Sequence, residues 1–394
     1  MKNLRVAIWI AVLLSLLSLL ELSSISHGYF VRQAAYLGVA LAAFVITSRI
    51  PVRFWKFWAP VLYIVSLLFL VGVLFLGGTG AKRWLTLGPV HLQPSELAKF
   101  SWILLIPRIY ERYGETPQIL TAGIVTAVPM LLVLIEPDLA TSVTFFVMFV
   151  MVSAVLGRNR VLLLYLTLVP LAIIFSFSPV LFLLFIGLSV GIVLWMRLRA
   201  GVALTLVFTL ITVGLLSPVV VNKGLKPYQR QRIVAFLNPE KYRTGPGWQT
   251  LQARIALGSG GILGKGYKKG TQKGLAFLPE AHTDFIFSSF GEEFGLVGTL
   301  VVIGGFLILL FHLFGFAESL EFRYHRGVAV GVAAYFLYQS VTNLATNVGL
   351  FPVAGIPLPF MTYGGSHLLA EYLMLGILVA IQRREAESHL HTTW

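Results

Sequence analysis

The chain opens on Val6-Ala-Ile-Trp-Ile-Ala-Val-Leu-Leu-Ser-Leu-Leu-Ser-Leu-Leu-Glu-Leu22, an apolar run in which Glu21 is the one charged side chain. A helix needs roughly 20 predominantly apolar residues to cross the hydrocarbon core of a bilayer. Lys2 and Arg5 precede the run as they would in a signal peptide, but no small-residue cleavage site follows it. We therefore expect a retained membrane helix here.

The composition of the whole chain agrees with this opening. Of its 394 residues, 57% are hydrophobic and 12% are charged, which is about half the charged share usual for a soluble domain. The chain has no Cys, which excludes disulfides and thiolate metal sites. Its net charge of +14 could indicate nucleic acid, but in so apolar a chain it favours Lys and Arg at helix ends facing anionic lipid.

Similar apolar runs recur along the entire length. We expect an all-α integral membrane protein, a polytopic bundle of 10–12 transmembrane helices, forming a single domain over 1–394. The runs at 161–176 and 180–196 are divided only by Ser176 to Pro179 and could form one bent element. The predicted helices are 6–23, 30–47, 57–76, 95–110, 119–136, 139–156, 161–176, 180–196, 202–221, 285–311, 327–349 and 366–382.

The positive charges alternate between the two sides of these helices. Cytoplasmic short loops should carry the excess of Lys and Arg, and this predicts that both termini lie inside. The short outer segments contain only Arg32, Lys82 and Arg83. The inner segments contain Lys2, Arg5, Arg49, Arg53, Lys56, Arg108, Arg112, Arg158, Arg160, Arg197, Arg199, Arg323, Arg326, Arg383 and Arg384.

One segment breaks the alternation. The predicted outer loop 222–284 holds eleven Lys and Arg through position 283, against Glu240 and Glu280, together with ten Gly and Trp248. Loops of this length cross the membrane largely regardless of charge. Such a concentration of cations suits an anionic ligand, whereas the alternative is a solvated loop lying over lipid headgroups.

The loop ends in Phe277-Leu-Pro-Glu-Ala-His-Thr-Asp284, directly before an apolar helix. A carboxylate at such a junction is partly removed from water, and it can then accept a proton near neutral pH as a general base. The alternative is that Asp284 caps the following helix, a role for which Asp is favoured. The spacing alone does not separate the two roles.

A second polar cluster contains Lys82-Arg83-Trp84 and Gln93-Pro-Ser-Glu96-Leu-Ala-Lys99. Glu96 and Lys99 are three residues apart, so they share one face of a helix. Charged side chains at membrane depth are costly and usually mark a functional site. The alternative is an ion pair that only fixes helix packing.

Other polar residues favour structural roles. Asp138, in the turn Glu136-Pro-Asp138, is typical of a helix cap. Asn343 and Asn347 share a helical face and favour helix packing. Non-helical backbone over Gly355 to Ser366 is tolerated in a membrane only where protein or a water-filled cavity surrounds it. The eight His show no zinc-binding spacing, so no metal site is predicted.

Several motifs of the chain together resemble those of the SEDS family of shape, elongation, division and sporulation proteins. Their residues are closer to the RodA branch of the family, which acts in cell elongation, than to the FtsW branch, which acts in division. Thr362, His367 and Glu136 depart from residues common in the family. The matching motifs are Pro227-Tyr-Gln-Arg-Gln-Arg-Ile233, Phe236-Leu-Asn-Pro-Glu240, Ile255-Ala-Leu-Gly-Ser-Gly-Gly261, Gly264-Lys-Gly266, Gly270-Thr-Gln272, Phe277 to Phe287, Gly80-Ala-Lys-Arg-Trp84, Gln93-Pro-Ser-Glu96 and Pro357 to Ser366.

The resemblance implies a peptidoglycan glycosyltransferase of the bacterial cytoplasmic membrane that polymerises lipid II, with a class B penicillin-binding protein as partner. No cofactor is evident, although a divalent cation could assist. A lipid II flippase or a non-catalytic scaffold for a transpeptidase are the alternatives. The resemblance implies Asp284 as the catalytic base. Together with the charge and position of the motif residues, it gives as substrate-binding candidates Arg83, Trp84, Glu96, Lys99, Arg230, Arg232, His282, Thr283 and Ser366.

Overall fold

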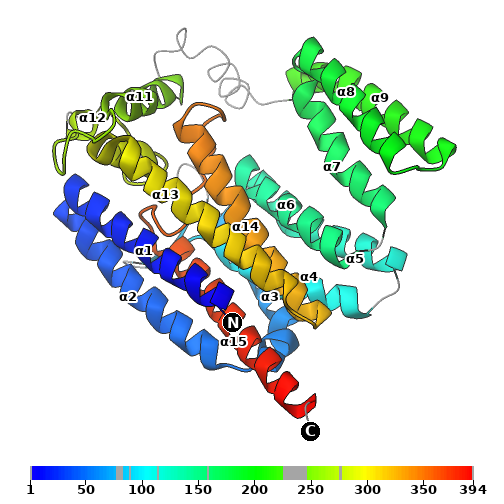
Figure 1. The fold of residues 1–394 in the computed structure, drawn as a ribbon, viewed down its shortest axis with the longest axis horizontal. Helices are drawn as coiled ribbons and strands as arrows, with labels where there is room; N and C mark the ends of the chain where they lie inside the picture. Colours follow the sequence, from blue (N-terminus) through cyan, green and yellow to red (C-terminus); the bar gives the residue numbers. More distant parts are fainter. Residues whose placement is uncertain are drawn as a thin grey trace. The chain divides into compact units, whose positions relative to one another are not determined.

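The computed structural model describes residues 2–76, 83–87, 90–112, 115–157, 159–224, 246–274 and 277–392. Within these ranges the chain is almost entirely helical (Figure 1). The longer helices are α1 (Lys2–Ile25), α2 (His27–Arg49), α3 (Val52–Leu76), α4 (Pro94–Arg112), α5 (Glu115–Ile135), α6 (Leu139–Leu156), α7 (Arg160–Phe175), α8 (Pro179–Trp195), α9 (Ala200–Gly224), α11 (Pro246–Ser259), α13 (Ile286–Glu318), α14 (Arg323–Asn347) and α15 (Gly365–Thr392).

Each of the twelve helices predicted from apolar runs has a counterpart in the structure. The uncertain pair is resolved into α7 and α8, which are separate helices because Ser178 and Pro179 begin a new helix after a short turn. Within the described ranges, nine helices are long and apolar enough to cross a membrane. Helix α4 is not among them because Glu96, Lys99 and other charged residues interrupt its apolar sequence.

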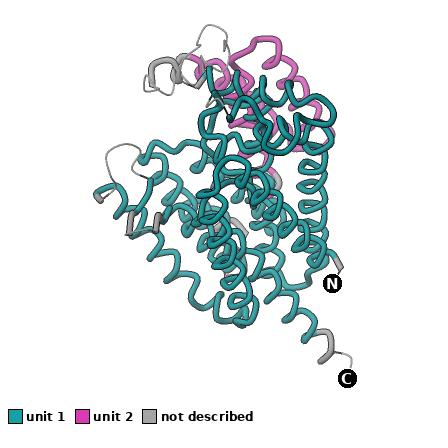
Figure 2. The backbone as a smooth tube through the Cα atoms, turned by 90° about the vertical axis from the view of Figure 1, so that its left-hand side faces the viewer, with its two compact units in different colours: residues 1–156, 235–394 teal, residues 157–234 magenta. Residues whose placement is uncertain are grey.

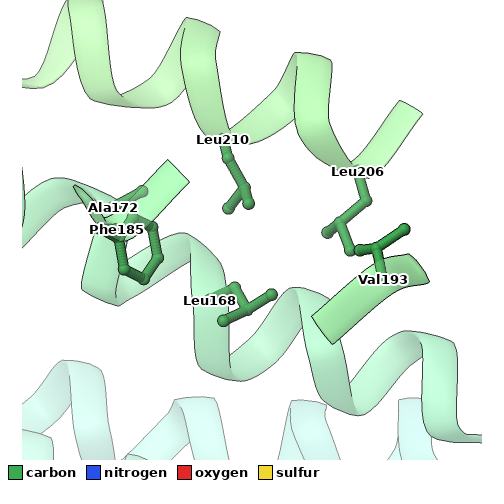
Figure 3. Close-up of a cluster of buried hydrophobic side chains, with 6 residues drawn as sticks. All are labelled: Leu168, Ala172, Phe185, Val193, Leu206 and Leu210. Atoms are coloured by element: carbon green, nitrogen blue, oxygen red, sulfur yellow. The ribbon is translucent and has the colours of Figure 1, made fainter. Parts of the chain in front are cut away.

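The chain divides into two compact units, residues 1–156 with 235–394 and residues 157–234 (Figure 2). The smaller unit contains α7, α8 and α9, which pack around a small apolar core (Figure 3). The side chains of this core are Leu168, Ala172, Phe185, Val193, Leu206 and Leu210. Its outer surfaces remain apolar, as expected of helices that face lipid.

Helices α14 and α15 are the most enclosed elements of the larger unit. In the most apolar stretches of α14 and α15, 72% of the residues are buried inside the protein, whereas the corresponding share in α2 is 22%. Helix α14 packs against α13, α6 and α4 (Figure 1), and α15 packs mainly against α2. Polar side chains on α14 therefore face protein instead of lipid.

A short hairpin precedes α4. Its strands β1 (Leu85–Leu87) and β2 (Val90–Leu92) pair antiparallel, with Leu85 opposite Leu92. The hairpin follows Arg83 and Trp84 directly, and α4 begins two residues after it, at Pro94. It thereby links the two halves of the second polar cluster.

The predicted outer loop is folded wherever it is described. It contains α11, which packs against α13, and the short α12 (Thr271–Gly274) (Figure 1). Helix α13 is broken at Gly295, whose φ of 64° lies in the left-handed region. The backbone atoms of residues 262 and 264 lie so close to Gly295 that a side chain would not fit there. Four backbone hydrogen bonds between the loop and α13 satisfy the amide and carbonyl groups at this break. They run from Lys265 N to Glu292 O, Gly266 N to Glu293 O, Leu296 N to Gly261 O and Val297 N to Ile262 O, with donor–acceptor distances of 2.9–3.2 Å.

Candidate functional site

The stretch Gly355 to Ser366, which is non-helical up to Gly364 and then forms the first turn of α15, adjoins several of the predicted site residues. Its Ile356, Leu358 and Phe360 are buried, as the rule for irregular backbone in membranes requires. The segment contacts the end of the outer loop, the start of α4 and Arg83. The loop end and both halves of the second polar cluster therefore adjoin one stretch of backbone.

The loop end is bound to this segment by backbone contacts. Thr362 donates from its Oγ1 to the carbonyl of Thr283 at 3.2 Å, and the Tyr363 amide donates to the carbonyl of His282 at 2.9 Å. These contacts fix the two residues that immediately precede Asp284. The position of Asp284 is thus set by neighbours on both sides.

Two amides hold Asp284 itself. The Nδ2 atoms of Asn343 and Asn347 donate to its backbone carbonyl at 3.1 and 2.9 Å, and Asn343 also donates to the carbonyl of Ile356 at 2.9 Å. The asparagines therefore do more than the helix packing expected of them, because they join the loop end to the irregular segment. Helix α13 begins at Ile286 with Phe285 at its N-cap position, so Asp284 does not occupy the cap.

His282, two residues before Asp284 in the chain, belongs to an aromatic cluster. Its ring stacks on Tyr29 from α2 with the centroids 4.3 Å apart, and it lies 5.7 Å from the ring of Tyr363. Burial lowers the pKa of His282 below its usual range, against the opposing charge of Glu280. The imidazole is therefore neutral at pH 7 and can accept as well as donate a hydrogen bond.

Glu96 and Lys99 form a buried ion pair on α4. Lys99 Nζ lies 2.6 Å from Glu96 Oε1, and the side chains are 1% and 2% exposed. From α14, Tyr335 donates its hydroxyl to Glu96 Oε2 at 3.2 Å, and its ring lies 5.1 Å from Lys99 Nζ. Ser366 adjoins the same helix start, because its Oγ accepts from the Gln93 amide at 3.2 Å.

Arg83 binds the turn between α5 and α6. Its Nη2 donates to the carbonyl of Pro137 at 2.6 Å, and its Nη1 lies 3.5 Å from Asp138 Oδ2. Asp138 also caps α6, as predicted, by accepting from the Thr141 amide at 3.2 Å. The Arg83 guanidinium lies 3.9 Å from the point that a side chain on Gly355 would occupy, which places it beside the irregular segment.

The remaining predicted residues differ in their placement. Trp84 is 41% exposed and is free to contact lipid or sugar. Arg230 and Arg232 lie outside the described residues. Within the described ranges, the acidic residues and His form no group of three that could hold a metal ion.

Two loop cations serve a structural purpose that was not predicted from the sequence. Lys273 Nζ lies 2.7 Å from Glu21 Oε1 on α1 and 2.8 Å from Glu293 Oε1 on α13. Lys265 pairs with Glu292 on α13 at 2.6 Å. These two lysines therefore do not serve an external anion, because acids in distant helices neutralise them. The signal was available: these acids interrupt apolar spans, as Glu96 does.

We expect Lys273→Met to loosen this part of the loop. The change leaves Glu21 and Glu293 buried side by side without their shared cation, and a hydrogen bond to a charged group contributes about 1.5–3 kcal/mol. The measurement is hydrogen exchange at the Lys265 and Gly266 amides, which should accelerate. Lys269→Met removes an exposed cation from the same loop and should leave this exchange unchanged; equal exchange in both variants would contradict the role of Lys273.

Comparisons with known proteins identify the family to which this chain belongs. The FtsW/RodA/SpoVE model, described as cell cycle protein, matches residues 3–188 and 183–387. The chain is 35% identical to peptidoglycan glycosyltransferase MrdB of Escherichia coli (strain K12), over 90% of this chain and 85% of MrdB. It is 33% identical to peptidoglycan glycosyltransferase RodA of Treponema pallidum (strain Nichols), over 78% of each chain.

Solved structures show the same fold. A chain from a peptidoglycan synthase complex that coordinates polymerization and crosslinking aligns with a TM-score of 0.73 and 26% identity, over 96% of this chain and 97% of its own. The rod shape determining protein RodA of Thermus thermophilus aligns with a TM-score of 0.64 and 23% identity, over 96% of each chain. The protein is therefore a multi-pass membrane protein of the FtsW/RodA/SpoVE family, the SEDS family that its motifs resemble.

Proposed function

We propose that this chain is a peptidoglycan glycosyltransferase that polymerises lipid II into β-1,4 glycan strands during cell-wall elongation, and so maintains cell shape. The names of its relatives support the reaction class. The observation that carries the proposal is the placement of Asp284, whose backbone two buried asparagines hold beside the irregular segment. Held in this way, the backbone of Asp284 gives the carboxylate a fixed point of attachment, which favours the positioning that a general base needs.

In the proposed reaction, Asp284 takes the proton from the 4-hydroxyl of the acceptor sugar. The hydroxyl oxygen attacks the anomeric carbon of the growing chain, a carbon–oxygen bond forms, and the bond to the polyprenyl diphosphate breaks. Attack from the face opposite the leaving group inverts the carbon and gives a β bond. The diphosphate departs with the bonding electrons and needs cations to stabilise its charge.

Of the candidate cations that the structure describes, Arg83 and Lys99, the former is the better placed for the diphosphate. Its guanidinium is part-exposed beside Gly355, and a planar fork of donors suits phosphate oxygens. Lys99 is 1% exposed and paired with Glu96, which suits a role in fixing α4 beneath the site. Trp84, His282, Thr283 and Ser366 remain candidates for contacts with lipid or sugar, together with Arg230 and Arg232.

The setting of the reaction follows from the same proposal. The distribution of Lys and Arg supports the cytoplasmic membrane with both termini inside and the 222–284 segment outside. A solved neighbour belongs to a complex that couples polymerization to crosslinking. We infer a transpeptidase partner of the class B penicillin-binding type, and a divalent cation as an optional aid that no described group of ligands holds by itself.

The test is to incubate the purified full-length protein with lipid II and to separate the products on a gel. Glycan polymer is the expected result. Translocation of labelled lipid II across vesicles without polymer would support a flippase instead. Neither activity, together with retained binding to the transpeptidase, would support a scaffold.

A further inference from the structure

The turn between α5 and α6 contains a buried carboxyl group that the proposed reaction does not use. The side chain of Glu136 is 2% exposed, and its Oε1 is buried with no hydrogen-bond partner among the described residues. A buried polar atom without a partner costs about 1–3 kcal/mol. Such a group persists in a folded protein when something else uses it.

The charges around Glu136 are already balanced without it. Arg83 forms its ion pair with Asp138 at 3.5 Å and donates to the carbonyls of Glu136 and Pro137. One cation and one anion therefore occupy the turn before Glu136 ionises. Burial and the Asp138 charge outweigh the attraction of Arg83 and raise the pKa of Glu136 to about 8.

We propose that Glu136 is a proton-controlled part of an anion subsite at Arg83, which accepts the lipid diphosphate when the Glu136 carboxyl is neutral and rejects it when the carboxyl is ionised. This inference rests on the proposed function, and it names the group that controls diphosphate binding. Glu136 is a substrate-specificity residue in this scheme. The proton transfer itself belongs to Asp284.

The chemistry of the two protonation states differs in two respects. A neutral carboxyl group has an O–H that donates a hydrogen bond, whereas a carboxylate only accepts hydrogen bonds. The oxygens of an ionised diphosphate are acceptors, so they bind the neutral carboxyl group and not the carboxylate. Ionisation also changes the summed charge of Arg83, Asp138 and Glu136 from zero to −1, which repels an anion in a site of low polarity. Both differences favour diphosphate binding to the neutral form.

No other described group near the turn accounts for the same behaviour. From α14, Tyr338 faces the turn, and its hydroxyl donates to the carbonyl of Ala140 at 3.2 Å. Arg83, Asp138 and Tyr338 are the charged and titratable groups that the described elements direct toward this turn.

The test is the KM for lipid II between pH 6.5 and 9.5, in the wild-type protein and in Glu136→Gln. If only the neutral form binds, the apparent affinity falls with the neutral fraction, so the wild-type KM should rise about tenfold between pH 7 and pH 9. The glutamine keeps a donor and cannot ionise, so its KM should change by less than about twofold. Glu318→Gln, an exposed acid at the far end of α13, should follow the wild type.

Parallel KM profiles for wild type and Glu136→Gln would overturn the inference, whereas absence of polymer at every pH would instead overturn the proposed function. A second measurement does not need the variant to fold. Binding of farnesyl diphosphate to the wild-type protein at pH 8, followed by calorimetry in two buffers, should take up about half a proton per probe bound. Binding without proton uptake would also overturn it.

Discussion

Replacing Asp284 with Asn should reduce kcat for lipid II polymerisation by about 10²–10⁴, the usual contribution of a positioned general base. Asn has the same shape as Asp but cannot accept the proton. The bonds from Asn343 and Asn347 reach the backbone carbonyl of residue 284, so they persist in the variant. The loss should therefore appear in kcat, with the KM for lipid II changed by less than about threefold.

The appropriate control replaces an acid at the opposite end of the same helix. Glu318 is exposed, and Glu318→Gln should polymerise at the wild-type rate. Thermal unfolding of the Asp284→Asn protein in detergent should match the wild type, which separates lost chemistry from lost folding. Unchanged polymerisation by Asp284→Asn would remove this residue as the base.

The second large effect is expected at the buried pair on α4. Lys99→Met leaves Glu96 buried without its cation, and removing one partner of a buried ion pair costs about 3–5 kcal/mol. The Tyr335 hydroxyl, which donates to Glu96, compensates only part of this cost. We expect a markedly lower midpoint of thermal unfolding and less monodisperse protein after purification.

The double variant Glu96→Gln with Lys99→Met tests whether the cost comes from the unpaired charge. Because both charges are removed, its unfolding midpoint should return most of the way to that of the wild type. If stability returns while polymerisation remains low, the pair also positions the site. A double variant as unstable as the single one would contradict the unpaired-charge explanation.

Local features of the sequence accounted for most of the fold. Whether a run such as 6–22 can cross a bilayer depends on its own length and polarity, so the twelve helices could be predicted without knowing their neighbours. The same holds for Glu96 and Lys99, whose spacing of three residues places them on one helical face. Asp138 as a cap of α6 is a further local feature.

Contacts between distant residues could not be predicted in this way. Lys273 meets Glu21 across 252 positions, and Thr283 meets Thr362 across 79. Hydropathy predicts that a helix lies in the membrane, but it does not predict which neighbouring helix or loop its polar face contacts. The sequence therefore identified a cationic loop, and only the packed helices showed that Lys265 and Lys273 pair with acids of α1 and α13.

By itself, the sequence determined the helical membrane fold, the family, and Asp284 and the Glu96–Lys99 pair as candidates. Tertiary structure alone decided that Asn343 and Asn347 hold the Asp284 backbone, that Arg83 binds the α5–α6 turn, and that Glu136 is buried with its Oε1 lacking a hydrogen-bond partner among the described residues. The physical reason is that burial and charge balance depend on what surrounds a side chain, and the surroundings exist only after the helices have packed.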